Sequence, residues 1–493
     1  MATTAVAAPS GYTGLYAFHK YWGKKPHEPI AFAIEQLTQE GQVVLDPFLG
    51  SGTAAREALL RSRAFVGFDI NPVAVELSHL LIKPPSNNLL REAIKQIEHC
   101  VKEIILDSYA LEDNETKATH YLWDGDTLKS VWVVNHRKRT ELQPTAHDLA
   151  LSASFAGYKS TRVRPPRFFT NARINAAPGL TLSDLMTGRA QRNLDLLIDA
   201  IRRCPDEVQH ALNLCLTAAS GQMTKMVFAV TGRGKTNGEK SSKIEVGSWV
   251  IGYWRPQLHF EVNVWNCFER RLKKLASALK AGDPLSSTLL ASDISEVITG
   301  KSTAYIGRGD CRSLLKSIPD SSVHLVITDP PHSDRVPYLE LSEFWNSLLG
   351  VEPDFSAEIV ISNARERSKS VKSYIEAMRG FLRDVTRVIH PEGFLVVLFN
   401  SRKKKEWDIF RPWFDAPHSE DKEPLRYVGH FPCTYSAGSV VQDNRKGGLK
   451  SDHALVFDRI DKPSSNERHL SILSRIPGWS SQPPSLSTEA DGK

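Results

Sequence analysis

Short apolar runs separated by polar turns give the first indication of the fold. Residues 43–45 are apolar, and a glycine-containing turn, an Ala- and Leu-rich segment over 54–61 and a second apolar run over 64–68 follow, ending at Asp69. The pattern predicts a strand, a turn, a helix and a second strand. This order is typical of a parallel sheet that binds a nucleoside at its carboxyl edge.

The same alternation of apolar runs and helical segments returns after Ser302. Strands are expected over 303–306, 323–328, 393–400 and 454–458, and helices over 311–318, 338–349, 371–390 and 406–415. Between the two stretches the pattern is mixed, with helices expected near 90–106, within 181–230 and over 262–279, and short strands near 121–123 and 131–134. The fold class predicted is therefore α/β: a doubly wound, Rossmann-like sheet split by a large mixed α/β insertion.

The chain length also favours more than one unit, because 493 residues exceed what a single hydrophobic core usually supports. We expect a flexible N-terminal arm over 1–20, a sheet domain formed by 21–85 and 301–460, and an inserted region over 86–300. The Ser- and Pro-rich segment 461–493 is expected to be a disordered tail.

Composition narrows the class of protein. Hydrophobic residues make up 41% and charged residues 24%, as in ordinary globular proteins. No apolar run approaches the roughly 18 residues that cross a bilayer. Residues 1–10 lack the basic and apolar regions of a secretory signal, so a cytoplasmic location is expected. The six cysteines form no Cys-x-x-Cys pair, which disfavours a zinc site or a disulfide framework.

Charge alone says little about partners. The net charge of +6 comes from 62 basic and 56 acidic residues, and many proteins with such a balance bind no nucleic acid. Basic clusters at 19–25, 162–167 and 402–405 are candidates for phosphate contact, but each is also compatible with a solvated surface.

The first candidate site is the turn after the first strand. Gly50 and Gly52 permit a tight backbone that approaches a ligand closely, and Asp69 can accept both hydroxyls of a ribose. The turn lacks the Gly-Lys-Ser/Thr ending of a phosphate loop. It begins with Asp46, which would repel phosphate but can hold an ammonium group, such as that of a methionine moiety.

The second candidate site is Asp329-Pro330-Pro331-His332, at the end of the predicted strand 323–328. Two prolines remove backbone donors and fix φ, which leaves a rigid set of acceptors for a primary amine. A planar residue at the fourth position can stack on a base, which must be flipped out or unpaired to enter. Taken alone, the tetrapeptide is also compatible with a strand that ends in a proline turn.

Together the two motifs resemble the amino-methyltransferases of DNA, and most closely the adenine-specific DNA methylases that usually carry a zinc-ribbon insert. Flanking segments share the resemblance: residues 19–26 (HKYWGKKP), 69–74 (DINPVA), 263–266 (NVWN), 336–345 (VPYLELSEFW) and 450–453 (KSDH).

The resemblance implies S-adenosylmethionine as cofactor, DNA as partner, and direct transfer of a methyl group to N6 of adenine or N4 of cytosine. It also implies that the sheet is a methyltransferase sheet and that residues 86–300 hold the target-recognition surface. The implied cofactor-binding residues are Lys25, Pro26, Asp46, Phe48, Gly50, Gly52, Thr53, Asp69, Asn71 and Asp310. The implied catalytic residues are Asp329, Pro330, Pro331 and His332, with Asp329 accepting from the target amine and His332 stacking on the base.

Two departures from the family pattern bear on function. The fourth catalytic residue is His332, where an aromatic residue is usual, and imidazole covers less of a base. Tyr338 is close enough in sequence to wall the base pocket, although a helix-packing role is the simpler one. The cysteines of the zinc ribbon are missing from 121–148, so no metal is predicted.

Two alternatives stay open at this stage: methylation of a base amine in RNA, and a catalytically lapsed nucleic-acid-binding subunit of a modification or defence complex.

Overall fold

A seven-stranded sheet forms the larger core of the computed structural model, which describes residues 11–484 except 136–137, 233–234, 237–238, 241–242, 250, 280–282, 286–287, 333–335, 402–403, 415–424, 435–450, 460–468 and 470. The strands are β1 (Val43–Asp46), β2 (Ala64–Asp69), β11 (Ala304–Arg308), β12 (Val323–Thr328), β13 (Ile389–Phe399), β14 (Leu425–Thr434) and β15 (Ser451–Arg459). Their order is β11-β2-β1-β12-β13-β15-β14. The first five are mutually parallel, and β15 runs antiparallel to both of its neighbours.

Helices cover both faces of this sheet, because its central strands are apolar on both sides. One face buries Val44, Leu325 and Val396 against α1 (His27–Leu37) and α2 (Thr53–Leu59). The other buries Leu45, Val326 and Val397 against α11 (Ile294–Ile298), α12 (Cys311–Leu314) and α14 (Val371–Val388), with α15 (Lys404–Trp407) and α16 (Arg411–Phe414) at its edge. The predicted α/β class with a doubly wound, Rossmann-like sheet is confirmed.

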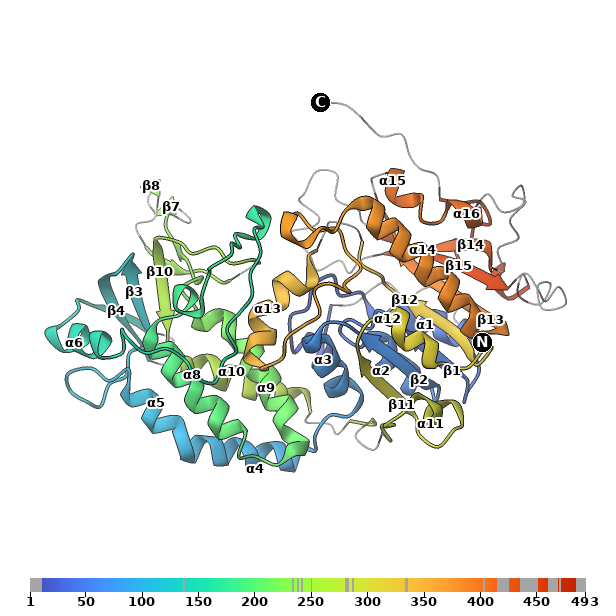
Figure 1. The fold of residues 1–493 in the computed structure, drawn as a ribbon. Coiled ribbons are helices and arrows are strands. Elements are labelled where there is room, and N and C mark those ends of the chain that lie inside the picture. Colours follow the sequence, from blue (N-terminus) through green and yellow to red (C-terminus); the bar gives the residue numbers. More distant parts are fainter. Residues whose placement is uncertain are drawn as a thin grey trace.

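The inserted region forms a second lobe beside the sheet (Figure 1). Its antiparallel sheet has the order β10-β3-β4-β5, built from β3 (His120–Asp124), β4 (Thr127–Asn135), β5 (Lys138–Leu142) and β10 (Leu258–Val262). Short strand pairs are β6 (Ala229–Val230) with β9 (Glu245–Val246) and β7 (Lys235–Thr236) with β8 (Glu239–Lys240). Its helices are α4 (Asn87–Ile97), α5 (Glu103–Asp107), α6 (Ala146–Ser154), α7 (Leu182–Leu185), α8 (Gly188–Ile201), α9 (Asp206–Ser220) and α10 (Val264–Ala278).

Two helices join the lobes. In Figure 1, α3 (Pro72–Ile82) and α13 (Tyr338–Leu348) lie between the sheet and the inserted region, and both contact α9. Val73 and Leu77 of α3 and Phe344 and Trp345 of α13 share one hydrophobic core with the inserted region. The two lobes therefore pack through a common apolar interior.

The structure differs from the sequence prediction at both ends of the chain. Within the expected arm, residues 14–17 form a short 3-10 helix, and Phe18 and His19 are buried. Within the expected tail, Leu473 and Ile476 pack under β14, and Ser480 bridges to His430. Isolated apolar residues in a polar segment give little periodic signal, which is why these contacts were not predicted. Residues 1–10, 461–468, 470 and 485–493 lie outside the described residues.

A smaller difference concerns the end of the insertion. Helix α11 falls within 86–300, yet its Ile294 and Val297 pack on the large sheet. Among the described residues, no helix combines the length and apolarity that spanning a bilayer requires.

Candidate functional site

The candidate site lies where the strand order reverses. Strand β1 ends at Asp46 and its parallel neighbour β12 ends at Thr328, with Leu45 opposite Val326. The chain leaves β1 toward β2 on one side and returns to β12 on the other. Such a switch point opens a crevice at the carboxyl edge of the sheet, the usual ligand site of this architecture.

The turn between β1 and α2 depends on glycine at two positions. Gly50 and Gly52 have φ of +54° and +80°, in the left-handed region. A Cβ atom on Gly52 would lie 2.7 Å from both Cα and Oγ of Ser78 in α3. The turn therefore brings α2 close to α3. Gly50 N donates to Asp69 Oδ2 at 2.7 Å, which ties the turn to the end of β2.

Two carboxylates flank this turn, and burial raises the pKa of both. The pKa of Asp46 is raised to about 7, although bonds from Thr328 Oγ1 (2.7 Å) and Phe48 N (3.1 Å) oppose the shift. The pKa of Asp69 is raised to about 6, opposed by bonds from Asn71 N and Gly50 N. A cationic or hydroxyl-bearing ligand would stabilise the ionised form of both carboxyl groups.

One pocket, with an empty volume of about 880 Å³ that opens to solvent, joins these groups to the second motif. Ten of the fourteen residues predicted for the site line it: Lys25, Asp46, Phe48, Gly50, Thr53, Asp69, Asn71, Asp310, Asp329 and Pro331. Pro26 lines a smaller adjoining cavity with Lys25 and Asp452. Gly52, Pro330 and His332 are not among the lining residues.

Several lining residues were not predicted for the site. Tyr21, Trp22 and Glu358 contribute to the wall, and so does Tyr338, which sequence reasoning had placed beside the base pocket only as an alternative to helix packing. Tyr21 contacts the turn, since a Cβ on Gly50 would meet its Cε1 at 3.5 Å. These residues come from irregular segments and the start of a helix, where periodicity carries no information about direction.

Two predicted cofactor residues are engaged by protein groups. Asp310 accepts from Arg312 Nε and Nη2, each at 2.9 Å, and caps α12. Asn71 is buried, donates to Ser342 Oγ at 3.0 Å and accepts from Asn346 Nδ2 at 3.1 Å. Asn71 therefore ties the start of α3 to α13.

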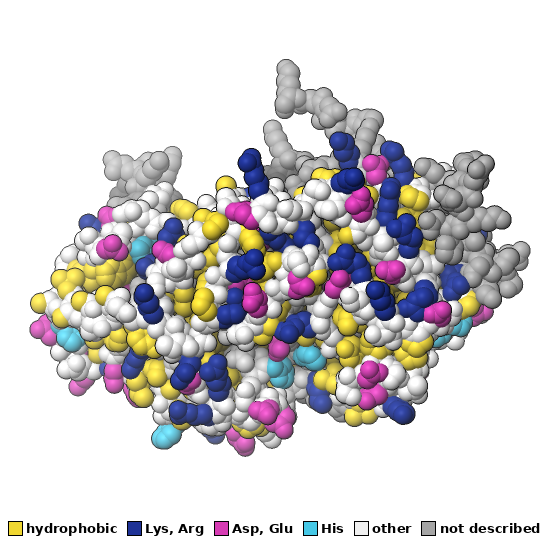
Figure 2. Space-filling view, viewed as in Figure 1, with side chains coloured by type: hydrophobic (Ala, Val, Ile, Leu, Met, Phe, Trp, Pro, Cys, Tyr) yellow, Lys and Arg dark blue, Asp and Glu magenta, His cyan; other side chains and the backbone are white. Residues whose placement is uncertain are grey.

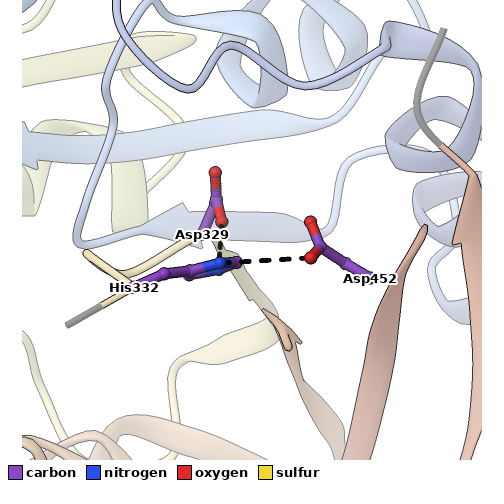
Figure 3. Close-up of side chains that lie close together, drawn as sticks. All are labelled: Asp329, His332 and Asp452. Atoms are coloured by element: carbon purple, nitrogen blue, oxygen red, sulfur yellow. Dashed lines mark ion pairs between the residues drawn. The ribbon is translucent and has the colours of Figure 1, made fainter. Parts of the chain in front are cut away.

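The second motif sits in a cluster of charged groups (Figure 3). His332 Nε2 lies 3.0 Å from Asp329 Oδ1, and His332 Nδ1 lies 4.0 Å from Asp452 Oδ1. Lys25 Nζ lies 3.4 Å from Asp329 Oδ1 and also forms an ion pair with Asp452. Its ammonium, which the resemblance implies binds the cofactor, is thus paired with two carboxylates of the chain.

The inserted region contacts the site through α13. Tyr253 Oη donates to the carbonyl of Glu340 at 2.8 Å, and Asn171 Nδ2 donates to Glu340 Oε2 at 2.7 Å. Arg164, one of the basic residues considered for phosphate contact, instead pairs with the buried Glu343 at 2.9 Å. The insertion therefore holds the helix that begins with Tyr338.

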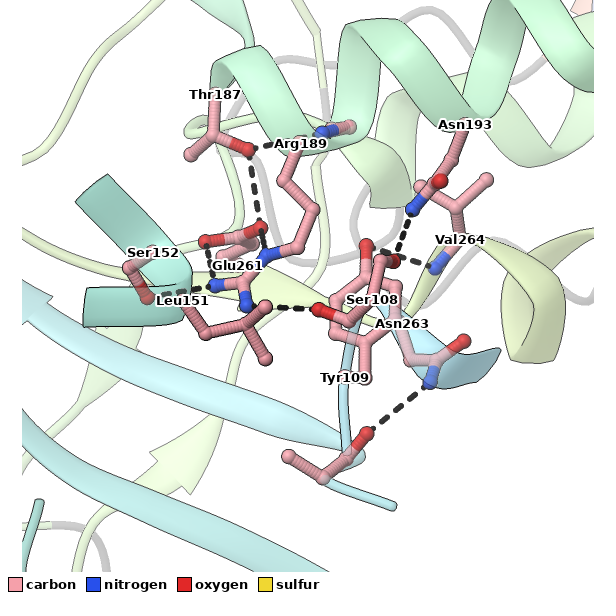
Figure 4. A network of polar contacts seen from close by, with 12 residues as sticks. Ser108, Tyr109, Leu151, Ser152, Thr187, Arg189, Asn193, Glu261, Asn263 and Val264 are labelled. Atoms are coloured by element: carbon pink, nitrogen blue, oxygen red, sulfur yellow. Dashed lines mark hydrogen bonds and ion pairs between the residues drawn. The ribbon is translucent and has the colours of Figure 1, made fainter. Parts of the chain in front are cut away.

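A buried polar network supports the inserted region (Figure 4). Arg189 Nε and Glu261 Oε1 are 2.8 Å apart, and each side chain is 2% exposed. The guanidinium also donates to Ser108 O, lies 4.2 Å from the ring centroid of Tyr121, and contacts Ser152. This network connects α8, α6 and β10, which fixes the small sheet against the helices.

Basic and acidic side chains are mixed on one face of the molecule. Figure 2 shows Lys and Arg side chains spread over the face that carries α14, with Asp and Glu side chains among them. Arg167, 60% exposed, lies 3.9 Å from Glu352. This face therefore presents mixed charge, in keeping with the small net charge of the chain.

Comparison with known proteins finds similarity in the N-terminal segment. Residues 8–80 match the family model of N6/N4 methyltransferases described as DNA methylase. Over this segment the chain is similar to DNA amino-methyltransferases. The predicted resemblance is confirmed there, over the turn of residues 46–53 (the cradle) and Asp69. Residues 329–332 lie outside the match.

Curated type II methyltransferases match over a segment of similar length. Type II methyltransferase M.BglI of Bacillus subtilis is 40% identical over 72 residues, 14% of this chain and 21% of the relative. M.XycI of Xanthomonas campestris pv. cyanopsidis is 37% identical over 68 residues, 14% and 23%. M.MvaI of Kocuria varians is 32% identical over 72 residues, 15% and 16%. The match therefore spans less than a quarter of each relative.

Among solved structures, the rRNA methyltransferase AviRa from Streptomyces viridochromogenes aligns over 91% of this chain and 90% of its own, at 11% identity. The TM-score is 0.24.

Proposed function

We propose that this chain is an S-adenosylmethionine-dependent DNA methyltransferase that modifies an exocyclic amine, N6 of adenine in the first place and N4 of cytosine in the second. The observation that carries the proposal is the single pocket shared by Asp46, Asp69 and Asp329. It brings the residues of a nucleoside site and an acceptor for an amine into one cavity, although Asp69 and Asp329 are 260 positions apart in sequence.

The residues present fit the proposed cofactor. Gly50 provides a wall without a side chain, Asp69 offers carboxylate oxygens at the end of β2, and Asp46 offers a buried negative charge at the end of β1. Asp69 would accept from the ribose hydroxyls and Asp46 would hold the amino group, as the resemblance implies. When bound, S-adenosylmethionine supplies an electrophilic methyl group on a sulfonium.

The chain's own part in the reaction is positioning. Asp329 would accept a hydrogen bond from the target amine and stabilise the positive charge that develops on its nitrogen. Pro331 fixes the backbone beside it, and its carbonyl accepts from Tyr374 Oη of α14. The target base must leave a duplex stack to reach this depth, so base flipping or a single-stranded substrate belongs to the proposal.

The inserted region is proposed as the target-recognition surface. Its Asn171 and Arg164 contact Glu340 and Glu343 of α13, the helix that follows the Asp329–His332 motif. A recognition unit in this position could couple target binding to the geometry of Tyr338, which lines the pocket.

The proposal is tested by transfer of a labelled methyl group to duplex DNA, single-stranded DNA and RNA, followed by nucleoside analysis. Wild type is expected to label DNA, and Asp329→Ala to lose at least about a hundredfold in rate while binding cofactor normally. Asp107→Ala, a substitution at a side chain that is 66% exposed, is the control and should match wild type. Labelling confined to RNA would move the proposal to an RNA substrate.

A further inference from the structure

One face of α10 carries three positively charged side chains beside a second cavity. This cavity has an empty volume of about 540 Å³ and opens to solvent. Figure 1 places α10 beside α9 in the inserted region, and the lining residues come from α10, from the end of α9 and from the turn after it: Arg270, Arg271, Lys274, Cys267, Ala219 and Gln222. The four positions on α10 follow the i, i+3, i+4, i+7 pattern, so they share one face of the helix.

These three cations have no carboxylate partner among the described residues. Arg270 Nε donates to the carbonyl of Asn266 at 2.9 Å, and Lys274 donates to the carbonyl of Ala17. No hydrogen bond or ion pair joins Arg271 to another residue that the structure describes, although its side chain is partly buried. Its five N–H donors are therefore available to a ligand.

The charges at this cavity repel one another. Burial lowers the pKa of Arg271, and the neighbouring Arg270 adds to that shift. Burial also lowers the pKa of Lys274, with a further contribution from Arg271. Like charges three and four residues apart on one helix face are unfavourable. An anion in the cavity would relieve this repulsion, whereas a neutral or cationic ligand would not.

The basic segment 162–167, which the sequence offered for phosphate contact, is different. Each of its three arginines has a carboxylate within 3.9 Å: Arg162 with Asp199, Arg164 with Glu343 and Arg167 with Glu352. The α10 face is therefore the better anion site of the two. Sequence reasoning did not single out 270–274, because a run of basic residues on a helix is usual on a solvated face.

The N-terminal segment connects this cavity with the pocket at the sheet edge. Lys274 donates to the carbonyl of Ala17, and Lys24 lines the pocket. Burial lowers the pKa of Lys24 to about 8, with a contribution from the charge of Lys274. The two ammonium groups are thus close enough to interact. An anion bound beside Lys274 would therefore lie close to the wall of the pocket.

From this arrangement we propose that Arg270, Arg271 and Lys274 bind a phosphate of the DNA backbone and so position the substrate on the inserted region. A guanidinium offers parallel N–H donors to two phosphate oxygens, and an ammonium adds a point charge. DNA as the source of the phosphate rests on the proposed function, whereas the preference for an anion rests on the cavity itself. Such contacts strengthen binding to every sequence and do not select one.

Anisotropy titration of the full chain with a fluorescein-labelled DNA duplex and with its single strand, over a series of salt concentrations, tests this site. Arg270→Gln, Arg271→Gln and Lys274→Gln should each weaken binding about tenfold and reduce the slope of log affinity against log salt by about one. Lys273→Gln is the matched control, because it makes the same charge change on the same helix. Lys273 pairs with Glu269 and does not line the cavity, so this variant should stay within about twofold of wild type.

Thermal unfolding separates a binding role from a structural one. Arg271 repels its neighbours, so Arg271→Gln should leave the melting temperature unchanged or raise it while the affinity for DNA falls. If Arg271→Gln instead lowers the melting temperature, Arg270→Gln and Lys274→Gln, both at exposed positions, still decide the proposal.

The outcomes separate this inference from the proposed function. Equal affinity and equal salt slope in the cavity variants and in Lys273→Gln would overturn the inference, and so would a wild type that binds no DNA. Calorimetry with inorganic phosphate identifies the source of the anion: phosphate binding that depends on Arg271, with DNA binding intact in Arg271→Gln, assigns the site to a free anion and also overturns the inference. A wild type that binds DNA through these residues but transfers no methyl group contradicts the proposed function alone.

Discussion

Asp46 and Asp69 flank the glycine turn of the pocket, and burial disfavours the ionised form of both carboxyl groups. Burial raises the pKa of Asp46 to about 7 and that of Asp69 to about 6, above the ordinary value of 3.8. A raised pKa means that the folded state binds protons more tightly than the unfolded state. Each group therefore lowers stability as the pH rises from about 4 through its folded pKa.

A cationic ligand beside Asp46 should reverse this effect for the bound state. Cofactor binding favours ionised Asp46, so affinity should be highest above pH 7 and fall as the pH drops below it, by at most about tenfold per pH unit for one linked proton. Calorimetry from pH 5.5 to 8.5 measures this. Asp46→Asn should bind weakly with a flatter profile. If the affinity of the wild type for cofactor changed as little with pH as that of Asp46→Asn, Asp46 would not be the group that holds the ammonium.

At the scale of elements, close approach of α2 and α3 sets the shape of the cradle. Gly52 is the residue just before α2 and has a φ of +80°. A Cβ atom at this position would overlap Ser78 of α3. Gly41 has a similar φ of +78°, but no atom lies within 4 Å of the position a Cβ would take. Substitutions at Gly41 and Gly52 therefore distinguish the cost of backbone strain from the cost of steric overlap.

Alanine at these two glycines should have unequal effects. Gly41→Ala is expected to cost about 1 kcal/mol of unfolding free energy through strain alone, and Gly52→Ala clearly more, because its Cβ overlaps Ser78. Gly52→Ala should also weaken cofactor binding, while Gly41→Ala should not. Denaturant titration and calorimetry measure both quantities, and equal losses of stability would contradict the packing described here.

A second element-level prediction concerns the buried pair in the inserted region. Glu261→Ala leaves the Arg189 guanidinium buried without its carboxylate and is expected to cost about 3–5 kcal/mol. Glu269→Ala removes an exposed pair with Lys273, whose side chain is 70% exposed, and should cost less than about 1 kcal/mol. Thermal unfolding compares the two. Similar small losses would show that the network does not hold the insertion together.

At the scale of the whole molecule, the regular parts of the large sheet were predictable and its edge was not. Apolar runs at 43–45, 64–68 and 323–328 gave β1, β2 and β12, since buried parallel strands are continuous in hydrophobicity. Strand β14 was missed because Gly429 and Pro432 interrupt it, a composition typical of an edge strand. Helix α1 was also missed.

The residue types of the candidate site were predictable from the sequence, but the directions in which their side chains point were not. Two motifs gave the pocket residues around Asp46 and Asp329 because each follows a strand that ends at the same edge of the sheet. The inward or outward facing of His332, and the pairing of Lys25 with Asp452, depend on tertiary contacts with Leu398 and β15. No local pattern in one sequence encodes such contacts.

The most direct measurement of the central claim is nucleoside mass spectrometry of DNA from cells that express the chain, compared with cells that express Asp329→Ala at equal level. The account predicts N6-methyladenine, or N4-methylcytosine, above background with the wild type and not with the variant. No modified base with either protein, or equal modification with both, would contradict it.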